Sequence, residues 1–231
     1  MNKSDLRLDW CSHQAARFAV ENWHYSKTMP VGKTAKIGVW ECGKFIGVIL
    51  FSNAVGAQAA KSLGLLNTEL CELVRIALQN HNAPVSRMVR ISISILHNAF
   101  PGLSCIVSFA DPEQGHIGGI YQASNWVYVG KSTASLMYEI DGKKIHSRTA
   151  NQNNRHFGHK CSDYDISNAK KIFALPKYKY LYPLSNDMRN KVEPMRQPYP
   201  KRKPSGGSAD GGTAIPIAGG GSNPTSPLQK T

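Results

Sequence analysis

The stretch FADPEQGHIGGIYQASNWVYVG, residues 109–130, combines Asp111, His116 and Tyr121 with closely spaced glycines. The apolar run LSCIVSF that leads into it predicts a buried strand ending at Asp111. In an open α/β sheet, ligands bind outside the carboxyl ends of the strands, so Asp111 and His116 are expected at a functional site. The same residues also allow a structural interpretation, in which Asp111 caps the next helix, His116 packs beneath a loop and Tyr121 packs against the sheet.

The patterns on either side of this stretch alternate between helix and strand. ECGK predicts the turn of one hairpin through Gly43, and Asp141-Gly142 predicts the turn of another. Residues 83–100 also alternate like a strand, but we expect a helix because parallel strands on either side need a crossover. The expected elements are a helix at 12–24, a hairpin at 35–53, a strand at 68–78, a helix at 83–100, a strand at 103–111, a helix at 113–124, a strand at 126–132 and a hairpin at 135–148. They predict a mixed α/β central sheet with flanking helices.

Composition divides the chain into three parts. Residues 1–150 carry the regular patterns and form the expected catalytic domain. Residues 151–203 are predicted to be a basic, aromatic and loop-rich C-terminal extension that packs on this domain. Residues 204–231 are neutral overall and rich in Gly, Pro and Ser, which predicts a disordered tail.

The formal net charge of +13 at pH 7 is concentrated in one region. Between Lys143 and Tyr180, nine Lys or Arg residues stand against two Asp. Clustered cations gain affinity for nucleic acid by releasing counterions from its phosphates, so a polynucleotide is an expected partner, with an ordinary solvated surface as the alternative. The candidate phosphate contacts are Arg148, Arg155, Lys160, Lys170 and Lys171.

Signals for export or membrane insertion are absent from the sequence. No apolar run is long enough to span a bilayer, and MNKSDLRLDW lacks the layout of a secretory signal. The five cysteines are an odd number without a CxxC pair, which indicates reduced thiols. We therefore expect a soluble, intracellular protein with no membrane partner.

The segment IYQASNWVYVG, residues 120–130, resembles the C-terminal half of the Gcn5-related N-acyltransferase superfamily, in which a helix with a tyrosine precedes an aromatic-led strand ending in glycine. The resemblance implies that Tyr121 protonates a departing thiolate. It also implies that acetyl-CoA or a related acyl carrier binds through its pyrophosphate at the start of the helix after ELVRIAL. The matching loop and helix start, QNHNAPVSRMVR, contain no glycine. The candidate cofactor contacts are Arg75, Ser86, Arg87 and Arg90.

A narrower resemblance covers about residues 15–185. SFADPEQGHIGGIYQASNWVYVG, ELVRIAL and LPKYKYLYPL are similar to the Mom DNA-modification proteins of bacteriophages. This resemblance implies a transferase in the host cell cytoplasm that adds a carbamoylmethyl group from a small-molecule donor to the exocyclic amine of adenine in double-stranded DNA, which hides the DNA from host restriction enzymes. The alternatives are an acyl-coenzyme A dependent N-acyltransferase on a protein or small amine, and a non-catalytic DNA-binding protein with this fold.

The amine of adenine is a weak nucleophile, so its modification needs a base and a preorganised electrophile. Asp111 is the first candidate base, His24 or His116 is the alternative, and Tyr121 is the candidate general acid. Because a paired base is poorly exposed, we expect the adenine to be extruded and stacked on an aromatic ring. The stacking candidates are Trp23, Tyr25, Trp126 and Phe157; the substrate-binding set is Tyr25, Trp126, Arg148, Arg155, His156 and Lys160.

A carbamoylmethyl product joins nitrogen to a methylene carbon, so simple acyl transfer cannot be the whole reaction. A redox-active iron ion is one solution. Its candidate ligands are His24, Asp111 and His116, and Tyr25 and Tyr121 supply further oxygen ligands. The motif HFGHKC contains three residues that could belong to a separate zinc site, His156, His159 and Cys161, but a fourth ligand is not visible. A histidine pair that faces DNA is the alternative for this motif.

Overall fold

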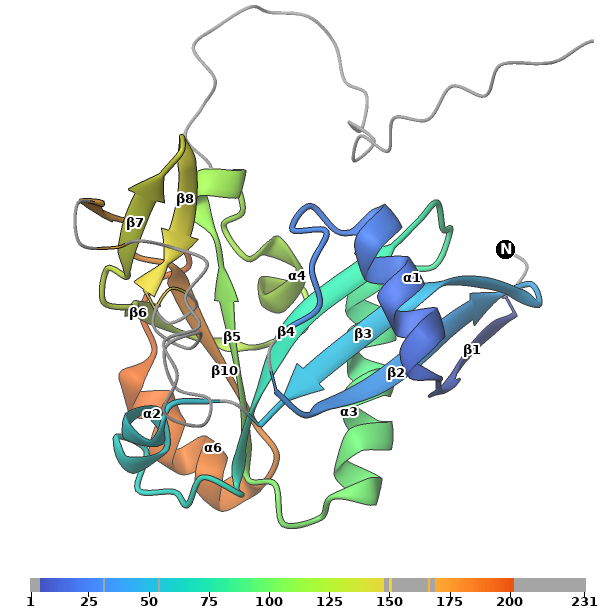
Figure 1. The fold of residues 1–231 in the computed structure, drawn as a ribbon. Coiled ribbons are helices and arrows are strands. Elements are labelled where there is room, and N and C mark those ends of the chain that lie inside the picture. The colour runs from blue at the N-terminus through green and yellow to red at the C-terminus, as the bar shows by residue number, and fades with distance from the viewer. Residues whose placement is uncertain are drawn as a thin grey trace, which may run out of the picture.

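The computed structural model describes residues 5–30, 32–53, 55–147, 150, 166 and 169–201. Within them, seven strands form the main sheet in the order β1-β2-β3-β4-β5-β10-β6 (Figure 1). In this sheet β4 and β5 are parallel, and the other neighbouring pairs are antiparallel. The strands are β1 (Leu6–Trp10), β2 (Thr34–Glu41), β3 (Lys44–Ser52), β4 (Leu70–Leu78), β5 (Cys105–Ala110), β6 (Val127–Lys131) and β10 (Tyr178–Pro183). The predicted mixed α/β sheet is confirmed.

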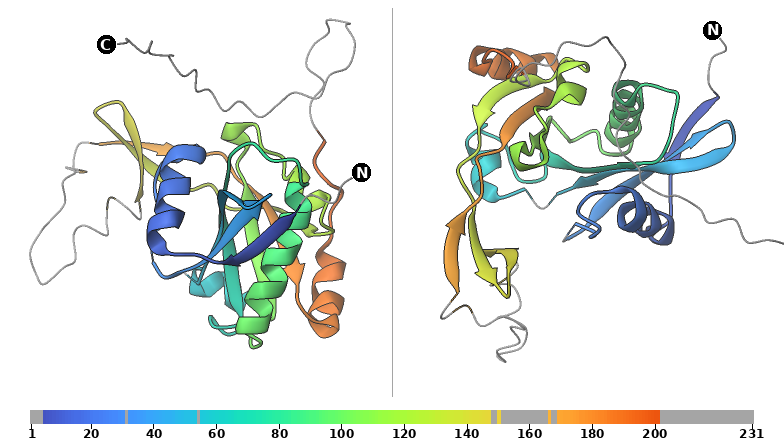
Figure 2. Two further views of the ribbon diagram at one scale, coloured as in Figure 1. Left: turned by 90° about the vertical axis from the view of Figure 1, so that its right-hand side faces the viewer. Right: turned by 90° about the horizontal axis from the view of Figure 1, so that it is seen from above.

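Helices cover both faces of this sheet (Figure 2). α1 (His13–Trp23) packs its alanine and valine side chains on β3 and β4, whereas α3 (Val85–Ala99) packs on the opposite face. α2 (Ala57–Lys61) and α6 (Asn186–Val192) pack with β5, β6 and β10, and a 3-10 turn, η2 (Glu193–Met195), follows α6. None of the helices in the described part is long and apolar enough to cross a membrane.

The predicted helices at 12–24 and 83–100 are α1 and α3, and the predicted hairpin at 35–53 is β2 with β3. The helix predicted at 113–124 is wrong in extent. This segment contains only a 3-10 turn, η1 (Pro112–Gln114), and the single turn α4 (Gly119–Gln122). Gly115 and Gly118 lie between them with φ of 69° and 83°. These left-handed conformations interrupt a right-handed helix.

Two strands of the main sheet were not predicted. β1 is a short edge strand with a weak pattern. β10 and α6 lie in the region that was predicted to be loop-rich, and this expectation is wrong for both elements. Because β10 lies between β5 and β6, the predicted boundary at residue 150 does not separate a complete sheet from an extension. Residues 204–231 lie outside the described residues.

A second sheet contains β7 (Leu136–Ile140), β8 (Lys143–His146) and β9 (Lys170–Phe173) in the order β8-β7-β9. The predicted hairpin on Asp141-Gly142 is confirmed as β7 with β8. Both turn residues have positive φ, 50° and 72°, as a two-residue hairpin requires. This small sheet projects from the main sheet (Figures 1 and 2).

The parallel strands β4 and β5 stay together over a short distance only. They pair from Leu70↔Cys105 to Glu72↔Val107, and β4 then continues to Leu78 without β5 as its partner. The helix α3 makes the crossover between them, as predicted. The carboxyl ends of β4 and β5 therefore diverge, and the residues that follow the last pair border an opening in the sheet.

Glu41 at the end of β2 fixes the loop between β4 and α3. Its carboxylate accepts hydrogen bonds from the backbone N–H groups of Asn82 and Ala83, both at 2.8 Å. Glu41 and Ala83 are buried. Hydrogen bonds to an ionised carboxylate are stronger than bonds between neutral groups, so Glu41 holds the segment from which α3 starts.

We predict that Glu41→Ala lowers the free energy of unfolding by about 2–3 kcal/mol, because it leaves two backbone N–H groups without their acceptor. Urea unfolding of the full chain measures this loss. The matched control is Glu21→Ala, which removes an exposed carboxylate paired with Arg17 and should change the free energy by about 0.5 kcal/mol or less. Equal losses in the two variants would contradict the role of Glu41.

Candidate active site at the divergence of β4 and β5

Ser108 and Tyr121 meet where β4 and β5 separate. Ser108 follows the last paired residue of β5, and its buried Oγ lies 2.8 Å from the Leu73 carbonyl and 2.7 Å from the Tyr121 hydroxyl. The serine hydroxyl has one proton, and the Leu73 carbonyl can only accept. Ser108 therefore donates to Leu73 and accepts from Tyr121. Burial raises the pKa of Tyr121 to about 12, so this phenol keeps its proton at neutral pH.

Aromatic packing fixes the ring of Tyr121. Its centroid lies 5.0 Å from that of Trp126 and 5.1 Å from that of Tyr180. Tyr180 comes close because Gly118 has no side chain: a Cβ at Gly118 would lie 2.3 Å from the Tyr180 ring. The Tyr180 hydroxyl also donates to the Ile117 carbonyl at 2.5 Å. Gly118 therefore has a structural role, because its lack of a side chain allows the start of α4 to pack closely on β10.

His24, Tyr25 and His116 come together from two parts of the chain. His24 caps the end of α1, and its ring centroid lies 4.3 Å from that of Tyr25, which lies 6.0 Å from that of His116. The Nδ1 atom of His24 accepts from the backbone N–H of Ser26 at 3.1 Å. In the neutral imidazole the proton is therefore on Nε2, so this ring nitrogen is a donor.

The surroundings of His24 are desolvated and positively charged. Burial is the main reason that its pKa falls to about 4, and the nearby charges of Arg75, His116 and Lys27 lower it further. Arg75 donates one hydrogen bond through Nη1 to the Val74 carbonyl at 2.8 Å. Its Nε is buried and has no hydrogen-bond partner among the described residues. An unpaired buried donor of this kind is rare in proteins, so Arg75 is available to an acceptor atom of a ligand.

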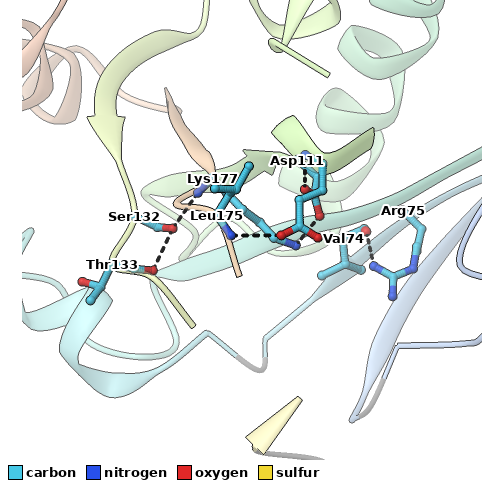
Figure 3. A network of polar contacts seen from close by, with 8 residues as sticks. Val74, Arg75, Asp111, Ser132, Thr133, Leu175 and Lys177 are labelled. Carbon is cyan, nitrogen blue, oxygen red and sulfur yellow. Dashed lines mark hydrogen bonds and ion pairs between the residues drawn. The ribbon is translucent and has the colours of Figure 1, made fainter. Parts of the chain in front are cut away.

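Asp111 makes its polar contacts elsewhere. One carboxylate oxygen accepts from the N–H of Glu113 at 3.0 Å and caps η1, as the structural interpretation predicted. The other lies 2.8 Å from Nζ of Lys177 (Figure 3). Tyr121 is bonded to Ser108 instead. A hydrogen bond or ion pair does not join Asp111 to Tyr121 in the part of the chain that the structure describes, although both follow β5.

The ligand set predicted for iron is not assembled. Among the described residues, no group of three His, Cys, Asp or Glu side chains is placed to hold a metal ion. Asp111 is bonded to Lys177 and to the η1 turn, whereas His24 faces Tyr25. The prediction that His24, Asp111 and His116 form one ligand group is therefore wrong. The residues considered for a separate zinc site, His156, His159 and Cys161, lie outside the described residues.

The candidate cofactor contacts are separated by the structure. Arg75 belongs to the group around His24, whereas Ser86, Arg87 and Arg90 lie on the first two turns of α3. The loop amides of Asn82 and Ala83 just before α3 are already bonded to Glu41. A carboxylate of the chain itself thus occupies amides of the loop that the resemblance assigns to a pyrophosphate. These two amides are not available to a pyrophosphate, whereas the expected contact at the start of α3 itself, with Ser86, Arg87 and Arg90, stays a prediction.

The predicted base-stacking residues have different surroundings. Trp126 is 0% exposed and packs on Tyr121 and Tyr182, so the prediction that it stacks on an extruded base is wrong. Trp23 packs against Phe18 and Phe45. Tyr25 is 53% exposed beside His24 and can receive a planar ligand. Lys170 and Lys171 are exposed on β9, and the remaining candidates, Arg148, Arg155, His156, Phe157 and Lys160, lie outside the described residues.

Sequence reasoning missed three polar residues that position the site, Ser108, Lys177 and Glu41. A serine within the apolar run CIVSFA was the available signal for Ser108, because a buried hydroxyl needs a partner. Lys177 and Glu41 gave no local signal, since their partners come from distant parts of the chain.

We predict that His24 titrates with a pKa of about 4, below the ordinary value of 6.5. The unfolded chain then binds more protons than the folded chain between these two values, so stability falls as the pH drops through this window. NMR of the ring nitrogens measures the pKa. Arg75→Gln removes a positive neighbour and should raise it, whereas Arg17→Gln, an exposed change elsewhere, should not. A His24 titration near pH 6.5 in the unsubstituted protein would sink this prediction.

The solved structures similar to this chain include an aminoglycoside acetyltransferase in complex with coenzyme A and kanamycin, 10% identical with a TM-score of 0.46, covering 82% of this chain and 99% of that one. They also include an N-acyl amino acid synthase from uncultured soil microbes, 11% identical with a TM-score of 0.45, covering 82% of this chain and 95% of that one.

Two further comparisons concern the sequence. The chain is 27% identical over 206 residues to the methylcarbamoylase mom of Escherichia phage Mu, covering 85% of this chain and 84% of that protein. A model of the Mom protein family matches residues 5–201. Because this match spans most of the chain, the protein belongs to the Mom protein family.

Proposed function

We propose that this protein is a DNA-modifying transferase that adds a carbamoylmethyl group to the exocyclic amine of adenine. The observation that carries the proposal is the protonated phenol of Tyr121, fixed by Ser108 at the divergence of β4 and β5, in a chain whose family includes a methylcarbamoylase. The modification would hide phage DNA from restriction enzymes in the host cell.

The reaction forms a bond between the adenine nitrogen and a methylene carbon, and the amine gives up one proton. A small-molecule donor supplies the carbamoylmethyl group and releases a leaving group. The donor has a carbonyl oxygen next to the reacting carbon. Arg75 Nε and His24 Nε2 are the hydrogen-bond donors that we assign to this oxygen, because one is buried without a partner and the other carries the imidazole proton.

Tyr121 remains the candidate general acid. Its high pKa keeps the proton available at neutral pH, and proton transfer to the leaving group would leave a phenolate. Ser108 lies 2.7 Å from this oxygen and can turn its single proton from Leu73 to the phenolate. We therefore assign to Ser108 the role of holding Tyr121 in place and stabilising its charged form.

The candidate bases differ in their availability. His24 uses Nδ1 to accept from Ser26, and the carboxylate of Asp111 is paired with Lys177. His116 is exposed beside Tyr25, so we favour His116 for taking the proton from the amine. Tyr25 would stack on the extruded adenine, since it is the exposed aromatic ring of this group. That acetyl-CoA or a related carrier is the donor stays a prediction.

Expression in cells, followed by digestion of their DNA to nucleosides and mass spectrometry, tests the proposal. We predict a deoxyadenosine that carries the mass of a carbamoylmethyl group. Tyr121→Phe should reduce its amount at least about 100-fold, because it removes the general acid. Tyr182→Phe is the matched control: it also removes one hydroxyl from a ring packed on Trp126, and it should leave the modification in place.

Unmodified deoxyadenosine in cells that contain the folded, unsubstituted protein would overturn the proposal. Unmodified DNA together with strong, salt-sensitive DNA binding would instead favour a non-catalytic DNA-binding protein. A modified small amine or protein in the same cells would favour a conventional N-acyltransferase.

A further inference from the structure

The small sheet is the end of a long ribbon that leaves the main sheet. β6 and β10 pair in the main sheet, and their chains continue outward into β7 and β9, which pair again from Leu136↔Phe173 to Glu139↔Lys170. Backbone hydrogen bonds from Ser132 to Lys177 and from Ala174 to Ser135 bridge the bend between the two sheets. We call residues 131–147 and 169–179 the arm. It projects from the same side of the main sheet as α1 (Figure 2).

The arm carries a large excess of positive charge. Its described residues include seven lysines and two carboxylates, Glu139 and Asp141. The lysines are Lys131, Lys143, Lys144, Lys170, Lys171, Lys177 and Lys179. Lys170 lies 3.6 Å from Glu139 in an exposed pair, which gives little stability. The strand register places Lys171 and Lys143 on the face of Tyr138 and Ile140, and Lys144 and Lys170 on the face of Glu139, so both faces are cationic.

Protection of an edge strand does not account for this surface. Lysines on β8 and β9, the edges of the small sheet, are a common way to prevent aggregation. However, the same surface exposes large apolar side chains: Phe173 is 71% exposed and Leu175 is 55% exposed. Exposed apolar side chains also occur elsewhere on this protein, as at Leu66 and Phe100, so what distinguishes the arm is the combination of such side chains with clustered lysines. Exposed aromatic and cationic side chains together are typical of nucleic-acid contact.

The base of the arm is joined to the candidate active site. Lys177 pairs with Asp111, and the N–H of Leu175 donates to the Glu113 carboxylate at 3.1 Å (Figure 3). Asp111 and Glu113 belong to the η1 turn between β5 and the segment that carries His116 and Tyr121. These contacts fix the arm relative to the opening between β4 and β5. A polymer bound along the arm would therefore have a fixed position relative to the η1 turn, which precedes His116 and Tyr121 in the chain.

We propose that the arm is the duplex-binding surface of this protein and that its lysines contact the phosphate backbone of double-stranded DNA. The inference rests on the proposed function, because it takes DNA as the partner. It adds which surface of the protein binds that DNA. Phosphate contacts position a duplex without reading its sequence. The Asp111–Lys177 pair then has a positioning role, because it aligns the bound duplex with the site at which one base reacts.

The test measures binding of a fluorescently labelled duplex of mixed sequence to the full chain at several salt concentrations. The arm variant carries Lys143→Gln, Lys144→Gln, Lys170→Gln and Lys171→Gln. Each lost phosphate contact lowers the slope of log affinity against log salt by about 0.9, so the variant should lose about 3–4 in slope and bind at least about 100-fold more weakly at low salt. The same four positions changed to Arg should keep wild-type binding.

A second variant controls for net charge. Lys44→Gln, Lys61→Gln, Arg189→Gln and Lys191→Gln remove the same number of exposed charges from β3, α2 and α6, and they should leave the slope within about 1 of the original. Equal weakening in the arm variant and this control, or no binding by the unsubstituted protein, would overturn the inference. Circular dichroism confirms that each variant is folded.

Tyr121→Phe separates this inference from the proposed function. It should lower the amount of the modified nucleoside at least about 100-fold and leave duplex binding unchanged, because Tyr121 is not part of the arm. If the arm variant loses binding but the unsubstituted protein modifies no adenine, the proposed function fails and the duplex-binding surface stands. If adenine is modified and the arm variant binds and modifies normally, the surface fails and the proposed function stands.

Discussion

The hydrogen bonds of Ser108 join the two strands at the point where their backbones part. β4 and β5 pair through Glu72↔Val107, and beyond that pair the Leu73 carbonyl is reached by the Ser108 side chain. The same hydroxyl accepts from Tyr121. One small polar group therefore closes the end of the parallel ladder and sets the direction of a phenol. Without this hydroxyl, the Leu73 carbonyl and the Tyr121 hydroxyl would both lose their hydrogen-bond partner at the opening.

The electrostatics of the opening follow from this arrangement. Side chains at this opening are largely removed from water. Burial disfavours the charged form of a side chain, so the direction in which it shifts each pKa can be predicted. It raises the pKa of Tyr121 and lowers that of His24, so both side chains are neutral and carry a proton at pH 7. Arg75 remains charged beside them. The region thus combines neutral hydrogen-bond donors with one fixed cation, which is suited to a polar, electron-rich ligand atom.

Local signals in the sequence were sufficient for much of the fold. The helix at 83–100 was found from its apolar periodicity and the need for a crossover, and the turns at Gly43 and Asp141-Gly142 from their chemistry. The place of β10 was missed because it depends on pairing with β5 and β6, which lie far away in the chain. For the site, the motif pointed to Tyr121, and its role as general acid stays a prediction. The burial of Trp126 and the partner of Asp111 depend on packing that no local pattern encodes.

The position of β10 has a consequence for the order in which the chain acquires its structure. β5 and β6 are synthesised early, but they are separated in the sheet by a strand that emerges only after the arm has been made. Until β10 is made, one edge of β5 is unpaired and β6 lacks the strand with which it pairs in the main sheet. Non-local pairing of this kind is slow and exposes strand edges to other chains. Folding of the half that contains the phenol is therefore expected to be completed only after β10 has been made, when the arm is already present.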